Sequence, residues 1–148
     1  MALTKVTSNV LNDGAVTTSK IVDANVTGTK LANDSVTNTK VGAEFTTSTA
    51  LTPGATVALD YTSAQVFTLT PNANTTINIT NPVIGVTKVI VITGAGGSYT
   101  TTYNVGGAAG TFNKISGTYD DTAGVKNFIQ MTCVSATEFW YTCSQIGS

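Results

Sequence analysis

Apolar residues recur at every fifth position along the first part of the chain. A ten-residue unit overlies this spacing, since VTTSKIVDAN is followed by VTGTKLANDS and then by VTNTKV. Two apolar side chains per unit are too few for one copy of the stem to build a core. The apolar face of the stem must therefore pack against another segment. The simplest cover is the same segment of another copy of the chain. The sequence therefore predicts a homo-oligomeric stem that buries Val6, Leu11, Val16, Ile21, Val26, Leu31, Val36 and Val41.

The local structure of this stem stays open between two alternatives. Turn formers recur at Asp13-Gly14, Asp23-Ala24 and Asn33-Asp34, and Val-Thr pairs between them favour extended chain. The TxxK segments are also compatible with single helical turns capped by a threonine such as Thr27. A period of five matches neither an α-helix nor a flat strand, so a long helix is not expected.

Composition indicates an all-β protein. Only 10 % of the 148 residues are charged and 41 % are apolar, which is not the composition of a disordered chain. The net charge is −1, with neither His nor Arg. A nucleic-acid partner needs a basic face rich in Arg, so we expect none.

We divide the chain into a stem (1–42), a Thr/Ser/Ala-rich hinge (43–53) and a globular domain (54–148). The domain shows a succession of alternating or apolar segments, of which 86–93 is a continuous apolar run typical of a central, doubly buried strand. This pattern predicts a β-sandwich of jelly-roll type. The expected strands are 56–61, 66–70, 75–80, 86–93, 98–105, 113–119, 126–134 and 138–146.

Three glycines follow the apolar run, at Gly94, Gly96 and Gly97. A dinucleotide-binding loop begins in this way but continues into a helix, whereas here a Thr/Tyr-rich segment typical of a strand follows. We therefore interpret the glycines as a hairpin loop and expect no cofactor.

Few residues are suited to catalysis or metal binding. Asp60, Asp120, Asp121 and Glu138 are the available carboxylates of the domain, and the usual His base and Arg clamp are missing. Asp13, Asp23 and Asp34 lack the dense acidic spacing of a calcium loop and fit solvated turns. We expect neither an enzyme nor a metal site.

The last two strands carry both cysteines. A two-residue turn at Ala136-Thr137 places Cys133 opposite Trp140 and Cys143 opposite Gln130, which predicts two free, partly buried thiols. The aromatic residues fit either sugar stacking or a core and subunit interface, and we favour the second. They are Tyr99, Tyr103, Tyr119, Phe139, Trp140 and Tyr141.

No apolar segment reaches the roughly 20 residues needed to span a bilayer. The start, MALTKVTSNV, lacks the apolar region of a secretory signal. We therefore expect a protein made in a cytoplasm, without a membrane partner.

Several segments resemble proteins of tailed bacteriophages. The stem is similar to the VTTAKL-type repeats of phage fibres, and MALTKVT resembles the start of many cyanophage virion proteins. The domain resembles a β-domain shared by tail fibres and small capsid-decorating proteins. The segments that carry this resemblance are Leu59-Asp60, 66–82 (VFTLTPNANTTINITNP), 85–94 (GVTKVIVITG) and 126–141 (KNFIQMTCVSATEFWY).

The resemblance implies a homotrimer with stems wound around a threefold axis and the β-domains forming a knob. From it we expect a capsid-decoration, cement or head-fibre protein on the outside of the virion, bound to the major capsid protein through its stem. The alternative is a short tail fibre, attached to tail proteins, whose aromatic loops contact a host glycan.

Overall fold

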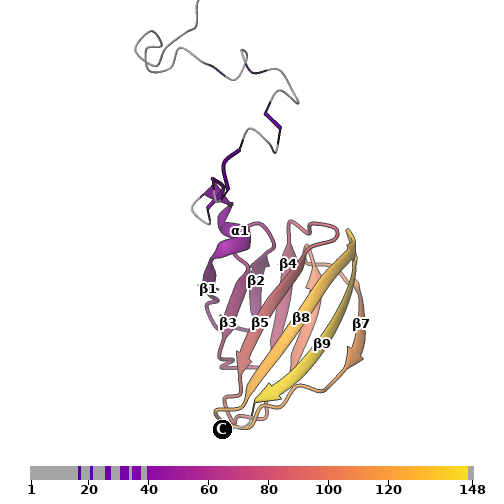
Figure 1. Cartoon of the computed structure of the whole chain (residues 1–148). Coiled ribbons are helices and arrows are strands. Elements are labelled where there is room, and N and C mark those ends of the chain that lie inside the picture. The colour runs from indigo at the N-terminus through magenta and orange to yellow at the C-terminus, as the bar shows by residue number, and fades with distance from the viewer. Residues whose placement is uncertain are drawn as a thin grey trace, which may run out of the picture. The chain divides into compact units, whose positions relative to one another are not determined.

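The computed structural model describes residues 17, 21, 26, 27, 31–33, 35–37 and 40–146. The chain divides into two compact units, Met1–Thr37 and Asn38–Ser148. The described part of the second unit, the knob, is built from strands apart from one short helix, α1 (Ala43–Thr46), which confirms the all-β prediction (Figure 1). The strands are β1 (Ser48–Ala50), β2 (Thr56–Asp60), β3 (Val66–Leu69), β4 (Thr75–Thr80), β5 (Thr87–Thr93), β6 (Thr101–Val105), β7 (Thr111–Ser116), β8 (Lys126–Ser135) and β9 (Glu138–Ile146).

The first six strands alternate between two sheets. β1, β3 and β5 lie side by side in the large sheet, and β2, β4 and β6 form the small sheet, with all neighbours parallel. Each pair of consecutive strands is thus one coil of roughly 20 residues stacked on the previous coil, a solenoid-like arrangement.

The last three strands complete the large sheet, whose order is β1-β3-β5-β8-β9-β7. β8 runs antiparallel to both β5 and β9, while β7 pairs with β9 in parallel. The two sheets together contain seven strand pairings, of which five are parallel. The jelly-roll topology is therefore not confirmed. Alternating patterns report which side of a strand is buried, and they do not report the direction of its neighbour.

The core lies between the two sheets. Alternate side chains of β2 and β4 meet those of β3, β5 and β8, and the inward residues Ile77, Ile90 and Ile129 are fully or almost fully buried. Phe139 of β9 stacks on Phe112 of β7 with ring centroids 5.2 Å apart. These inward positions agree with the alternation in the sequence.

The predicted hinge is part of the folded knob. Residues 43–53 hold α1 and β1, and the Thr47 carbonyl accepts hydrogen bonds from the amides of Gln65 and Val66. Beside α1, the side chain of Lys88 is completely buried. Its Nζ donates to the Glu44 carbonyl and lies 5.5 Å from the centre of the Phe45 ring.

Candidate functional site

The outer face of the large sheet combines apolar and uncharged polar side chains. It is formed by the outward residues of β5, β8 and β9, and we call its centre the β5–β8 face. The register pairs place Val91 beside Phe128, Val89 beside Gln130, and Thr132 beside Trp140. The β5–β8 face is defined by Val89, Val91, Phe128, Gln130, Thr132 and Trp140.

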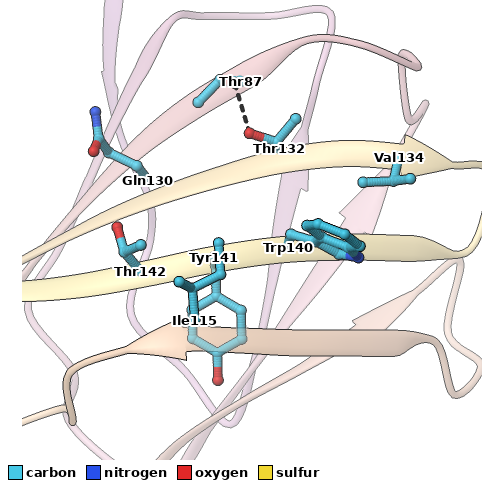
Figure 2. Close-up of a pocket in the computed structure, with 8 residues that line it drawn as sticks. All are labelled: Thr87, Ile115, Gln130, Thr132, Val134, Trp140, Tyr141 and Thr142. Carbon is cyan, nitrogen blue, oxygen red and sulfur yellow. Dashed lines mark hydrogen bonds between the residues drawn. The ribbon is translucent and has the colours of Figure 1, made fainter.

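A groove of about 300 Å³ crosses one end of this face. Figure 2 shows Trp140 and Val134 at one end of the group, Gln130 and Thr142 at the other, and the hydroxyls of Thr87 and Thr132 joined by a hydrogen bond. That bond is 2.7 Å long. The remaining lining residues are Ile115 and Tyr141.

Trp140 is the only tryptophan of the chain, and 48 % of its surface is exposed. Its Nε1 donates a 2.9 Å hydrogen bond to the Glu138 carboxylate, which also accepts one from the side-chain Nδ2 of Asn113. These bonds fix the indole on the sheet. A fixed aromatic ring among hydroxyl and amide groups is suited to binding a sugar or a second protein surface.

The carboxylates proposed from the sequence serve as hydrogen-bond acceptors in turns and loops. Asp60 accepts bonds from the amide and hydroxyl of Thr62, and Asp120 accepts one from the amide of Thr122. Among the described residues, His, Cys, Asp and Glu form no group of three suited to holding a metal ion.

Asp121 organises the glycine-rich loop. It accepts hydrogen bonds from the amides of Ala95 and Tyr99, at 3.0 and 2.8 Å, and from the Tyr119 hydroxyl at 2.8 Å. Partial burial alone would raise the pKa of Asp121, but these bonds to the charged form lower it below 3.8.

The glycine-rich loop was predicted to close a hairpin, and that prediction is wrong. It connects β5 in the large sheet to β6 in the small sheet, so the two strands are not paired. Gly94 is buried there, and a Cβ at this position would overlap the Thr122 carbonyl. The glycine is required by close packing against the backbone of the β7–β8 connection.

Both cysteines are free and buried, which confirms the predicted free thiols. The turn at Ala136-Thr137 is also present, but the predicted register is wrong by one residue. A bulge between Cys133 and Ser135 sets Cys133 opposite Phe139 and Cys143 opposite Ile129. Burial raises the pKa of both thiols, so they are poor nucleophiles.

The predicted aromatic residues separate into two groups. Phe139 is fully buried, and Tyr103, Tyr119 and Tyr141 pack against the core, as the core interpretation expects. Trp140 points outward from the large sheet, and Tyr99 lies in the loop between β5 and β6. Alternation along β9 carries this signal, since Trp140 falls between two inward residues.

The structure describes five of the eight proposed stem residues, and all five are exposed. These are Ile21, Val26, Leu31, Val36 and Val41, with exposed fractions of 44, 52, 46, 61 and 37 %. Val6, Leu11 and Val16 lie outside the described residues.

Sequence reasoning missed the β5–β8 face as a surface, although its β5 residues belong to the apolar run.

Within the described part of the chain, we find no helix with the length and apolar character that crossing a bilayer requires. A scan against protein-family models gave no matching family, and searches of curated proteins and of solved structures gave no match either.

Proposed function

We propose that this protein is a non-enzymatic structural component of a bacteriophage virion, a homotrimeric capsid-decoration, cement or head-fibre protein. The stem binds the capsid shell on its outside, and the knob points outward. The phage assignment follows the resemblance of the stem repeats and of the segments between Leu59 and Tyr141. The many small contacts of a repetitive stem, summed over several copies, suit a stabilising role.

The observation that carries the proposal is the exposure of apolar stem residues at five-residue spacing. Leu31 and Val36 expose 46 and 61 % of their surface in a single chain. A regular row of exposed apolar side chains favours a partner that follows the same spacing, and a second copy of the stem does so.

The oligomeric part is tested by placing a charge in the stem. Leu31→Asp puts a carboxylate at a contact between copies, where an unpaired buried charge is costly. We expect the mass in solution, measured by light scattering, to fall from trimer to monomer. The exposed Asn33→Asp adds the same charge two residues away and keeps the trimer. An unchanged mass for Leu31→Asp would contradict the proposed stem.

The location is tested by counting copies in purified virions. Quantitative mass spectrometry against the major capsid protein gives the ratio directly. A ratio near that of the capsid protein supports decoration of the whole shell. A handful of copies per particle supports the second candidate, a short tail fibre.

One feature favours that second candidate. Trp140 lies on the same outer face as Gln130 and Thr142, which offer amide and hydroxyl groups around an exposed ring. This combination suits stacking and hydrogen bonding to a sugar. Binding of the full chain to a glycan array, lost in Trp140→Ala, would support a receptor-binding role.

A further inference from the structure

We propose that the β5–β8 face is a contact between copies of this chain, separate from the stem. The inference deepens the proposed assembly by assigning a self-association surface to the knob. All the residues that support this inference lie in the knob, and none lies in the stem.

The first support is that the outer side of β5 is apolar but remains partly exposed in the single chain. Its inward residues Ile90 and Ile92 are fully buried, while its outward residues Val89 and Val91 remain partly exposed. A strand that is apolar on both sides is typical of one covered on both faces. The single chain covers only the inner side.

The second support is continuity of the apolar surface across strands. Val66 of β3 pairs with Val89, and Val91 pairs with Phe128 of β8, so apolar side chains run over three neighbouring strands. The charged residues at outward positions of β5, β8 and β9 are Lys126 and Glu138, and both lie at the ends of strands. An uncharged centre between polar ends matches the composition of protein interfaces.

The third support is the contrast with the opposite face of the knob. The outward residues of the small sheet are threonine and asparagine with one alanine and one aspartate, and the hydroxyls of Thr76 and Thr102 bond to each other at 3.0 Å. Most side chains of this face are therefore polar. The outer face of the large sheet is the more apolar of the two, which favours it over the small sheet as the surface that contacts a neighbouring copy.

The size of the face fits a second copy. The strands β3, β5, β8 and β9 have four, seven, ten and nine residues, and at ~3.3 Å per residue and ~4.8 Å between strands their outer surface covers roughly 480 Å². A standard interface buries about 800 Å² per partner. The face therefore covers more than half of the area that each partner buries in a standard interface, and its lack of central charge favours a like surface over a charged partner.

Trp140 allows the face to be tested without altering the fold. Because it is the only tryptophan, its fluorescence reports on this face alone. We expect acrylamide to quench Trp140 several-fold less in the assembled full chain than in the same protein diluted to monomer mass. Equal quenching in both states would show that the face stays open and would overturn the proposal.

A charge on the face supplies the second arm. Phe128→Asp is expected to weaken self-association at least about tenfold, which corresponds to about 1.4 kcal/mol, and to restore quenching of Trp140. Thr102→Asp, on the polar outer face, is the matched control and should change neither. If Phe128→Asp fails to fold, judged by circular dichroism, Val134→Asp at a more exposed position replaces it.

The outcomes separate this proposal from that of the stem. If Leu31→Asp yields monomers but Trp140 is quenched equally in the assembled native protein and in these monomers, the stem is supported and the β5–β8 face is not. If Leu31→Asp changes nothing while Phe128→Asp dissociates the assembly, the reverse holds. Protection of Trp140 by a glycan instead of by assembly would make the face a ligand site and overturn the inference.

Discussion

The Lys88 ammonium donates a 2.5 Å hydrogen bond to the main-chain carbonyl of Glu44. This bond joins the middle of the large sheet to α1, and the rings of Phe45 and Tyr61 lie 5.5 and 6.0 Å from Nζ. The helix is too short to be stable by itself. Its position therefore depends on the buried lysine.

Removing the Lys88 charge should release α1 while leaving the knob folded. Lys88→Met replaces a buried ammonium with an apolar chain of similar length, so we expect the free energy of unfolding to change by about 1 kcal/mol or less. Cleavage after Glu44 by a glutamate-specific protease should become faster. The exposed Lys126→Met serves as the control, and equal cleavage of both variants would contradict the role of Lys88.

Because Lys88 is buried, we also expect the stability of the fold to depend on pH. Burial lowers the pKa of Lys88 below 10.5, and the nearby carboxylates of Glu44 and Asp60 only partly oppose this effect. Between the lowered pKa and 10.5 the unfolded chain binds more protons than the folded one, so stability rises with pH in that window. Urea unfolding of the native protein and of Lys88→Met, compared up to pH 10, should show this rise only with the lysine present.

Tyrosine titration should act in the opposite direction at higher pH. Burial raises the pKa of Tyr61 above its usual 10.0, and its hydroxyl donates a 3.1 Å hydrogen bond to the Met131 carbonyl. The neutral form is favoured in the fold, so this stability is complete below pH 10 and is lost as pH rises above it. Tyr61→Phe should cost about 1 kcal/mol at neutral pH and make alkaline unfolding less steep. Equal steepness in both proteins would contradict this assignment.

Asp121 should contribute more to the stability of the fold than the adjacent Asp120. Asp121→Ala removes an acceptor for two loop amides and the Tyr119 hydroxyl, and we expect a loss of about 1–3 kcal/mol. Asp120→Ala removes one turn bond and should cost less. Because the pKa of Asp121 is lowered, its contribution is present above pH 3.8 and is lost as pH falls through the lowered value. Thermal melts of both variants at neutral and acidic pH check these expectations.

Gly117 should not tolerate a side chain. Its φ is +79°, and a Cβ there would overlap the Cys143 carbonyl of β9. Gly117→Ala therefore combines backbone strain of about 1 kcal/mol with a steric clash, and we expect β7 to separate from β9. Faster amide exchange in 111–116 is the measurement. Gly106→Ala, where φ is +58° and the space is open, isolates the backbone effect.

The sequence predicted the positions of most strands because alternation identifies their buried sides. It did not predict parallel pairing, since Ile77 and Ile79 alternate identically in either direction. The Cys133 register was missed because a bulge leaves no clear mark in the residues around it. β1 was missed because Ser48 to Ala50 are all exposed and carry no pattern. For β5, the apolar run predicted burial on both sides, and the single chain buries only the inward residues such as Ile90 and Ile92.

The order of the strands also sets where this fold can grow. β8 and β9 close the stack of coils on one side, and among the described strands β1 and β2 lie at the free edges of their sheets. Additional coils of roughly 20 residues fit only on that side, between the stem and β1, without disturbing the β8–β9 end. The length of the knob can therefore change by whole coils at the β1–β2 end, while the β8–β9 end stays unchanged.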